Sequence, residues 1–255
     1  MKNIFITGAG AGIGLATARL FAEKGWFVGA ADRNLESLQA LQKELGNTRC
    51  SIHAMDVTDV ASVQIALADF TENTGGNLDI LHNNAGILKV GAFEKLPLAE
   101  HQQLIEINVI GLLNVLHSAF PYLRETPNAQ VINMSSASAL FGIPDFVSYS
   151  GSKHAVRAIT EALNIEWEQH DIMVSDLMPP FVNTGMVQAS QAESRIITRL
   201  GAKLTAEKVA EEVWKLAQKP RLHHPISSSL RIAWALVRLA PTSATRGVLK
   251  RLWKE

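Results

Sequence analysis

The sequence predicts an α/β fold in which one doubly wound parallel sheet carries helices on both faces. Short runs rich in apolar and β-branched residues alternate with amphipathic segments along the first two-thirds of the chain. A glycine cluster separates the first such run from the first amphipathic segment, and small, amide or hydroxyl residues follow several of the other runs. Because open α/β sheets bind ligands at the carboxyl ends of their strands, these observations together favour a ligand-binding parallel sheet.

The overall composition excludes several other classes of protein. The chain has 255 residues, of which 47% are hydrophobic and 19% charged, and we treat residues 1–255 as one domain. The 24 basic and 24 acidic residues balance, which argues against nucleic acid as a partner. Cys50, the single cysteine, cannot form an internal disulfide. The N-terminal apolar run is too short for a signal peptide, and no apolar run approaches the ~20 residues that span a bilayer. We therefore expect a cytoplasmic protein.

The first expected strand, 3–7, leads directly into the glycine cluster. The spacing G-x-G-x-x-G is not met, because Ile13 stands at its last position, but T-G-x-x-x-G-x-G is met from Thr7 to Gly14. Glycines let a backbone approach a pyrophosphate, and the first N–H groups of the helix expected over 15–24 favour its charge. The predicted phosphate-binding residues are Gly8, Gly10, Ala11, Gly12, Ile13 and Gly14.

A second expected strand, 26–31, ends at Asp32 and Arg33. Asp32 lies 18 residues after Gly14, where a carboxylate would accept hydrogen bonds from the adenosine ribose and repel a 2′-phosphate. Arg33 would favour NADP, because a guanidinium group at this place can pair with a 2′-phosphate. The favoured interpretation of Arg33, however, is a solvated turn residue. The sequence thus predicts NAD, with NADP as the alternative.

Two more strand–helix alternations follow. A helix over 35–45, stopped by Gly46, precedes a third strand at 49–55, and Asp56 and Val57 come directly after that strand. Asp56 is also a candidate N-cap of a helix or turn. A fourth strand near 78–81 leads into Asn84, Ala85 and Gly86, whose small and amide side chains suit a backbone that passes close to a ligand.

Tyr149 and Lys153 are separated by four residues, which places both side chains on one face of a helix. A neighbouring ammonium group favours the phenolate form, so the phenol could exchange a proton with an alcohol near neutral pH. By composition alone such a pair is commonplace. A third candidate for the same site is Ser136, which lies thirteen residues before Tyr149. It stands at the end of an expected fifth strand, 129–134, where open α/β sheets bind their ligands.

The ordered set of motifs resembles the short-chain dehydrogenase/reductase family from the N-terminus to about residue 218. The motifs are Thr7-Gly8-x-x-x-Gly12-x-Gly14, Asp32, Asp56-Val57, Asn83-Asn84-Ala85-Gly86, Asn108, Ser136 and Tyr149-x-x-x-Lys153. The resemblance implies a Rossmann-like NAD(P)-binding domain, with Ser136 polarising the substrate oxygen and Tyr149 as the acid/base. It implies that Lys153 holds the ribose and assists Tyr149, and that Asn108 fixes a water molecule. It also implies a homodimer or homotetramer.

The segment after the expected sixth strand, 172–178, departs from the family in one place. Pro180 follows Pro179 where the family usually has Pro-Gly, although Val182 and Thr184 match the positions that hold the nicotinamide amide in the family. By resemblance, residues 185–204 form a lid over the substrate. Its apolar side chains suggest an uncharged or lipophilic substrate. Thr205 is the expected N-cap of a helix that runs to about 218.

Residues 220–255 form a C-terminal extension of different character. It carries seven basic residues and one acidic residue, and 229–241 is strongly apolar with Arg231 and Arg238 one heptad apart. Such a segment can lie on an anionic membrane surface. A helix that covers the pocket or contacts another subunit is the favoured interpretation.

The sequence therefore predicts an oxidoreductase that moves a hydride between NAD(P)(H) and a small carbonyl or alcohol substrate, without a metal ion. Two alternatives stay open. One is a catalytically idle dinucleotide-binding protein that acts as a redox sensor or scaffold subunit. The other is a membrane-surface reductase of the lipid or retinoid type.

Overall fold

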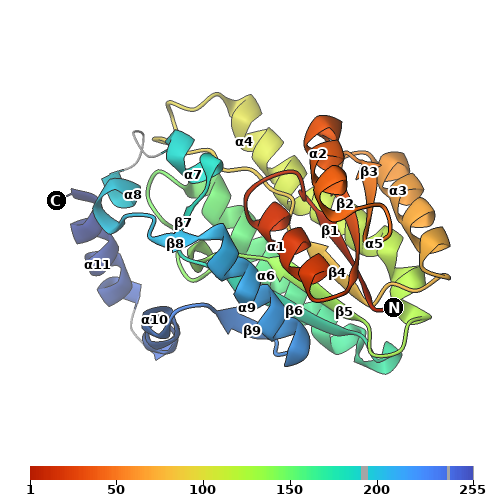
Figure 1. Ribbon diagram of the computed structural model, residues 1–255. Coiled ribbons are helices and arrows are strands. Elements are labelled where there is room, and N and C mark those ends of the chain that lie inside the picture. The colour runs from red at the N-terminus through yellow and green to blue at the C-terminus, as the bar shows by residue number, and fades with distance from the viewer. Residues whose placement is uncertain (191–194, 240–241, 255) are drawn as a thin grey trace.

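The computed structural model describes residues 1–190, 195–239 and 242–254 and has at its centre a seven-stranded, fully parallel sheet (Figure 1). The strand order is β3-β2-β1-β4-β5-β6-β9, so the chain winds outward in both directions from the junction of β1 and β4. This arrangement confirms the predicted doubly wound α/β fold. The strands are β1 (Asn3–Thr7), β2 (Phe27–Asp32), β3 (Cys50–Ala54), β4 (Ile80–Asn83), β5 (Gln130–Met134), β6 (Met173–Met178) and β9 (His223–Pro225).

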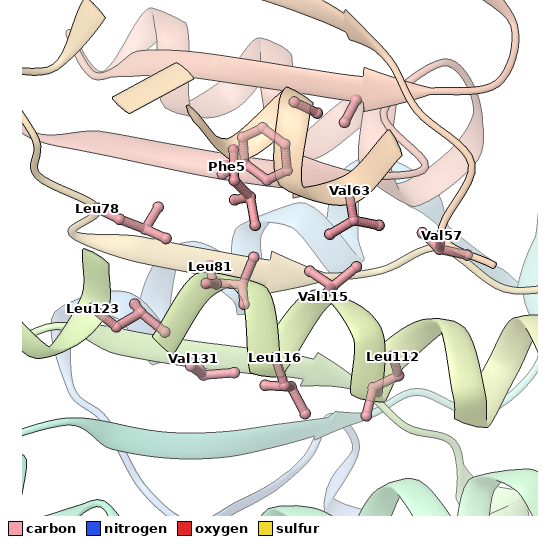
Figure 2. Packing of buried hydrophobic residues seen from close by; sticks show 14 of the residues in the cluster. Phe5, Val57, Val63, Leu78, Leu81, Leu112, Val115, Leu116, Leu123 and Val131 are labelled. Carbon is pink, nitrogen blue, oxygen red and sulfur yellow. The ribbon is translucent and has the colours of Figure 1, made fainter. Parts of the chain in front are cut away.

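Two apolar layers cover the two faces of the sheet, because alternate side chains along each strand point to opposite faces. Phe5 of β1 and Leu81 of β4 pack under α3 (Val60–Asn73), α5 (Gly111–Arg124) and α6 (Val147–Glu166), as Figure 2 shows for Val63 and Val115. The neighbouring residues Ile4 and Ile6 face the opposite layer, formed by α1 (Gly12–Glu23), α2 (Leu35–Leu45) and α9 (Ala206–Gln218). The predicted N-cap is confirmed, since Thr205 Oγ1 accepts the Lys208 N–H.

The helical segment 98–124 is longer and more apolar than we expected for any run in this sequence. By length and composition alone it could cross a membrane, which contradicts our expectation that no run approaches that length. It consists of α4 (Leu98–Ile105), the π-helix Glu106–Ile110 and α5, and α5 buries Leu112, Val115, Leu116 and Leu123 in the core. The apolar composition is therefore explained by packing on the sheet.

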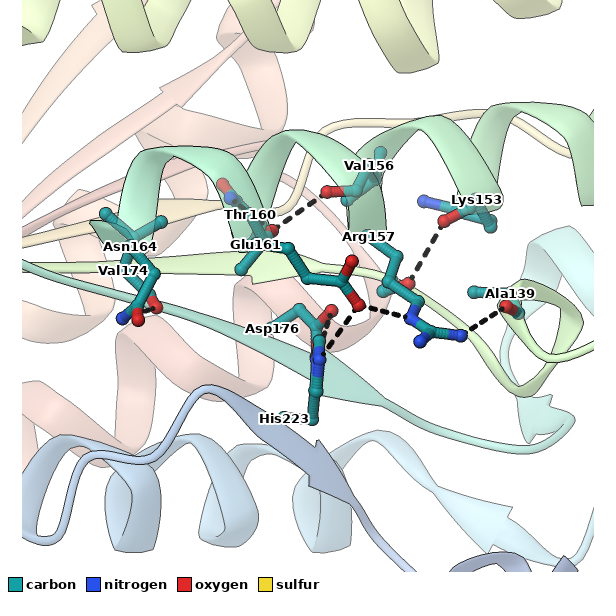
Figure 3. Close-up of polar contacts among 12 residues, drawn as sticks. Ala139, Lys153, Val156, Arg157, Thr160, Glu161, Asn164, Val174, Asp176 and His223 are labelled. Carbon is teal, nitrogen blue, oxygen red and sulfur yellow. Dashed lines mark hydrogen bonds and ion pairs between the residues drawn. The ribbon is translucent and has the colours of Figure 1, made fainter. Parts of the chain in front are cut away.

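The edge strand β9 was not predicted, because His223-His224-Pro225 shows no strand pattern. It pairs with β6 in parallel and brings His223 against Asp176 and Glu161 (Figure 3). The Nδ1 atom of His223 lies 3.1 Å from both Asp176 oxygens, and its Nε2 atom lies 3.1 Å from Glu161 Oε1. Burial raises the pKa of Asp176, and the contact with His223 partly offsets that effect. The imidazole thus connects β9 to the buried end of β6 and to α6.

His82 lies in the central strand β4 and is fully buried. Its burial should make the stability of the protein depend on pH. Its Nδ1 atom donates to Ile132 O at 3.1 Å, and its Nε2 atom has no hydrogen-bond partner among the described residues. Burial lowers the pKa of His82 to about 4. Only the unfolded chain then binds a proton between pH ~6.5 and pH 4, so stability falls as the pH falls through this window.

We expect His82→Val to remove part of this pH dependence. Between pH 7.5 and pH 5.0 the wild-type free energy of unfolding should fall by about 2 kcal/mol more than that of the variant. Urea unfolding at the two pH values measures the difference, with His117→Gln on the exposed face of α5 as the matched control. Equal pH dependence in wild type and His82→Val would show that His82 is not held neutral by burial.

Candidate active site

The loop between β1 and α1 and the first turn of α1 are so closely packed that Gly8 and Gly14 have no room for a side chain. Gly8 has φ of +69°, and a Cβ atom there would lie 3.0 Å from Ala85 Cα. A Cβ atom on Gly14 would overlap the carbonyl oxygen of Gly8. Gly12, at φ +53°, also adopts a left-handed conformation. The loop and the first turn of α1 therefore present a bare backbone to the space above the sheet, as a phosphate cradle requires.

Asp32 fixes this loop to the end of β2. One of its carboxylate oxygens accepts the Gly10 N–H at 3.0 Å and the other accepts the Asn34 N–H at 2.9 Å. The side chain of Arg33 is 62% exposed, and its nearest acidic partner is Asp56 at 4.0 Å. Asp32, the last residue of β2, and Arg33, which follows it, thus make different contacts.

Asp56 caps a turn and does not cap a helix. Its Oδ1 atom accepts both the N–H and the hydroxyl of Thr58, at 2.9 and 2.8 Å, whereas Asp59 is the N-cap of α3. Burial acts to raise the pKa of Asp56, but the Thr58 hydrogen bonds and the nearby Arg33 outweigh it and the pKa is lowered. The expected turn role is confirmed and the helix-cap alternative is wrong.

The ends of β1 and β4 are joined by Thr7, a residue to which the sequence analysis gave no role beyond its place in the glycine motif. Its hydroxyl oxygen accepts the N–H groups of Asn84 and Ala85, at 3.0 and 2.9 Å. The Asn84 amide in turn donates to the carbonyls of Thr7 and Gly8. In the sequence, this role could have been inferred only from the hydroxyl side chain that directly precedes the glycine cluster.

Tyr149 and Lys153 lie one turn apart on α6, as predicted, with Lys153 Nζ 5.6 Å from the centre of the Tyr149 ring. Lys153 Nζ donates to Met134 O at 2.8 Å, at the end of β5. Ser136 follows that strand, hydrogen-bonds to Tyr149 and accepts the Ser138 N–H through Oγ at 3.1 Å. The hydroxyl of the neighbouring Ser135 donates instead to Lys153 O. Residues from the end of β5 and the start of α6 thus meet at one point.

Burial dominates the electrostatics of this pair. It lowers the pKa of Lys153 to about 8. It raises the pKa of Tyr149, and the hydrogen bond from Ser136 offsets only part of that rise. Our expectation that the lysine would bring the phenol close to neutral ionisation is therefore wrong for the ligand-free protein. Desolvation outweighs the charge of an ammonium group that bonds to a backbone carbonyl.

Asn108 lies in the π-helix Glu106–Ile110, a local widening that often marks a functional position. Its amide side chain pairs with the backbone of Ile87 in both directions, at 2.8 and 2.9 Å, and its Nδ2 atom also donates to Ser152 Oγ at 3.3 Å. It is buried beside Gly86, where a Cβ atom would lie 3.1 Å from Asn108 Oδ1. Asn108 therefore holds the segment after β4 against the helix of Tyr149 and Lys153.

A cleft of about 300 Å³ connects the glycine loop to Tyr149. An adjoining hollow of about 130 Å³ contains Arg33, Asp56 and Val57. Gly10, Gly14 and Asn108 support the walls without lining either space. Six apolar lining residues were not predicted, and no periodic signal singled them out: Ile87, Leu88, Met134, Phe146, Pro180 and Phe181. The predicted residues that line the cleft are Gly8, Ala11, Gly12, Ile13, Asp32, Asn84, Ala85, Gly86, Ser136, Tyr149, Lys153, Pro179, Val182 and Thr184.

The segment after β6 forms the far wall of the cleft. Pro179 O accepts the Ala137 N–H at 2.9 Å, so this segment is held next to Ser136 despite the second proline. Val182 and Asn183 form β7, which pairs with β8 (Leu204–Thr205) across the base of the expected lid. The lid region contains α7 (Gly185–Ser190) and α8 (Arg195–Leu200), while its residues 191–194 lie outside the described part of the chain.

Comparison with known proteins agrees with this geometry. The family model for short chain dehydrogenase matches residues 2–195. Oxidoreductase UcpA of Salmonella typhimurium is 32% identical over 227 residues, which cover 85% of this chain and 86% of UcpA. Serine 3-dehydrogenase of Rhizobium radiobacter is 32% identical over 224 residues, covering 86% and 89%.

Two solved structures share the fold and contain a nicotinamide cofactor. A 3-ketoacyl-(acyl-carrier-protein) reductase from Brucella melitensis complexed with NADH superposes with a TM-score of 0.80 at 27% identity, covering 88% of this chain and 96% of that one. A short-chain dehydrogenase/reductase from Burkholderia phymatum in complex with NAD gives 0.82 at 26%, covering 93% and 92%. Together with the motifs and the fold, these matches show that the chain belongs to the short-chain dehydrogenase/reductase family of oxidoreductases.

Proposed function

We propose that this protein interconverts a carbonyl compound and an alcohol with NAD(H), using Tyr149 as the acid/base. One observation carries the proposal: the phenol of Tyr149, the hydroxyl of Ser136 and the ammonium group of Lys153 converge in the same cleft that begins at the glycine loop. Gly8 and Gly12 line this end of the cleft, where the lack of side chains lets a pyrophosphate approach the backbone. When bound, a nicotinamide dinucleotide supplies or accepts the hydride.

The roles of the three residues follow from their hydrogen-bonding capacity. Ser136 and Tyr149 each offer an O–H group to a carbonyl oxygen, which gains negative charge during reduction. Tyr149 then gives up its proton to that oxygen. The raised pKa of the buried phenol keeps it protonated, the form that reduction needs. Lys153, fixed by Met134 O, supplies positive charge beside the ring and stabilises the phenolate that forms.

The cofactor we propose is NAD, with NADP disfavoured by Asp32. The carboxylate stands beside the glycine loop, and the guanidinium group of Arg33 lies 4.0 Å from Asp56. We expect NADH to bind on the order of tenfold more tightly than NADPH, because the carboxylate repels the additional phosphate. Fluorescence titration with both nucleotides measures the ratio, and Arg33→Ala should leave it unchanged. The assignment would be contradicted if NADPH bound more tightly than NADH, or if Arg33→Ala lost its binding of NADPH.

The substrate we propose is uncharged and at least partly apolar. Beyond Tyr149 the cleft is lined by Leu88, Phe146, Phe181, Met186 and Val187, and these described residues are all apolar. Spectrophotometric turnover of a series of ketones and aldehydes of increasing chain length tests the proposal. We expect kcat/KM to rise about fourfold per added methylene until the space is filled, and carboxylated analogues to react poorly. Preference for charged analogues would refute it.

We also propose that the chain forms a homodimer or homotetramer through α4, α5 and α6. Leu113 is exposed on α5 and Val147 and Ile165 are exposed on α6, while Ile110 is exposed on the π-helix between α4 and α5. Val147 and Ile165 lie on the same side of α6, five helical turns apart. Light scattering of Leu113→Asp should give the monomer mass if this face is the contact, and an unchanged mass would exclude it.

A further inference from the structure

The C-terminal end of the chain has a charge distribution unlike the rest. Residues 226–255 contain six of the 24 basic residues and only one of the 24 acidic residues, Glu255. They therefore carry a net charge of +5, and the remaining 18 basic and 23 acidic residues give 1–225 a net charge of −5. The net charge of the whole chain is zero because the charges of these two regions cancel.

This segment folds into two helices that expose apolar and basic side chains together. In α10 (Ser228–Leu239), Ile232 is 62% exposed and Leu236 61% exposed, one turn apart. In α11 (Thr242–Lys254), Val248 is 61% exposed. The side chain of Arg238 lies outside the described residues. We define the C-terminal basic surface by its exposed members Arg231, Ile232, Leu236, Arg246, Val248 and Lys250.

Each helix is held against the protein by a tryptophan that lies on the side away from the exposed aliphatic residues, and on α11 this side also carries Arg246 and Lys250. Trp234 of α10 packs on the guanidinium of Arg157, 4.5 Å from the ring centre, and on the ring of His223, the residue shown between Asp176 and Glu161 in Figure 3. Trp253 of α11 donates to Asp145 at 3.0 Å, and α11 also packs against α8. The exposed apolar side chains are therefore presented outward from anchored helices.

We propose that the C-terminal basic surface docks on an anionic lipid bilayer. Arginine and lysine beside exposed aliphatic side chains are the features that bind helices in the plane of a bilayer, where the cations meet anionic headgroups and the aliphatic groups enter the acyl boundary. A second copy of the chain fits this surface less well, because a symmetric contact would bring cations against cations. The membrane alternative, which the sequence alone disfavoured, gains its support from the outward exposure of these aliphatic groups.

The contacts that anchor α11 lie beside the substrate end of the cleft. Asp145, the partner of Trp253, directly precedes Phe146, which lines the cleft, and α8 belongs to the expected lid. The proposal does not rest on hydride transfer, since it concerns residues outside the cleft.

Co-sedimentation of the full chain with vesicles tests the proposal. The vesicles are phosphatidylcholine alone or phosphatidylcholine mixed with phosphatidylglycerol, at low and at high salt. We expect the chain to sediment only with the anionic vesicles and to be released by salt. The double variant Arg246→Gln/Lys250→Gln should lower the partition coefficient roughly thirty-fold, and Ile232→Ser/Leu236→Ser should lower it as well.

The matched control removes two exposed lysines elsewhere, Lys24→Gln/Lys43→Gln, and should change binding less than about twofold. All variants should keep the oligomer mass of the wild type and its turnover of a water-soluble substrate. The proposal is overturned if the wild-type chain stays in the supernatant, if neutral vesicles bind it equally, or if the control variant loses as much binding as Arg246→Gln/Lys250→Gln. A change of mass in Ile232→Ser/Leu236→Ser would assign the surface to a subunit contact instead.

Discussion

Replacing Tyr149 by phenylalanine is expected to lower kcat/KM by about 10³-fold or more while NADH binding changes little. The substitution removes one oxygen atom, and with it both the proton donor and one of the two hydrogen bonds to the substrate oxygen. The ring stays in place because Phe146 and the apolar cluster around it pack against the aromatic face. Steady-state turnover and fluorescence titration of NADH measure the two effects separately.

Tyr122, the only other tyrosine, is the matched control, and Tyr122→Phe on α5 should leave kcat/KM unchanged. This experiment also separates the enzyme from the catalytically idle alternative. An idle dinucleotide-binding protein would show no turnover in the wild type, and Tyr149→Phe would then change nothing. Full activity of Tyr149→Phe would instead assign the proton transfer to another group.

Lys153→Met is expected to abolish most activity and to make the ligand-free protein more stable. Burial lowers the pKa of Lys153 to about 8, so folding a charged lysine at pH 7 costs about 3 kcal/mol relative to the unfolded chain. Methionine has a similar shape without the charge, although Met134 O loses its donor, which costs ~1–2 kcal/mol. The net gain should be about 1–2 kcal/mol, with kcat/KM reduced at least ~10²-fold.

The pH dependence of this gain gives a sharper test than its size. Because the folded pKa lies below the unfolded one, the wild type recovers stability as the pH rises from about 8 toward ~10.5. The advantage of Lys153→Met should therefore shrink by about 1.3 kcal/mol between pH 7 and pH 9 in denaturant unfolding. Lys43→Met, at an exposed position on α2, should show no such trend. A constant difference would mean that Lys153 is not desolvated in the folded protein.

The elements that the sequence predicted are those with a strong local signal. Gly46 ends α2 at φ +85°, and Thr205 caps α9, because each depends on one residue and its immediate neighbours. The strand β9 was missed because it pairs with β6, whose partner residues lie 47 positions earlier in the sequence. The π-helix at Asn108 was missed because the sequence on both sides of it is typical of one uninterrupted, mostly apolar helix.

By itself the sequence determined the α/β fold, the glycine loop, and the order of the chemically distinctive residues from Asp32 to Lys153. These follow from backbone conformation and helix spacing, which are local properties. Only the tertiary structure decided that burial raises the pKa of Tyr149 and lowers that of Lys153, because desolvation depends on every segment packed around a group. It also decided which side chains of the C-terminal helices face outward, since contacts with Arg157 and Asp145, far away in the sequence, fix their orientation.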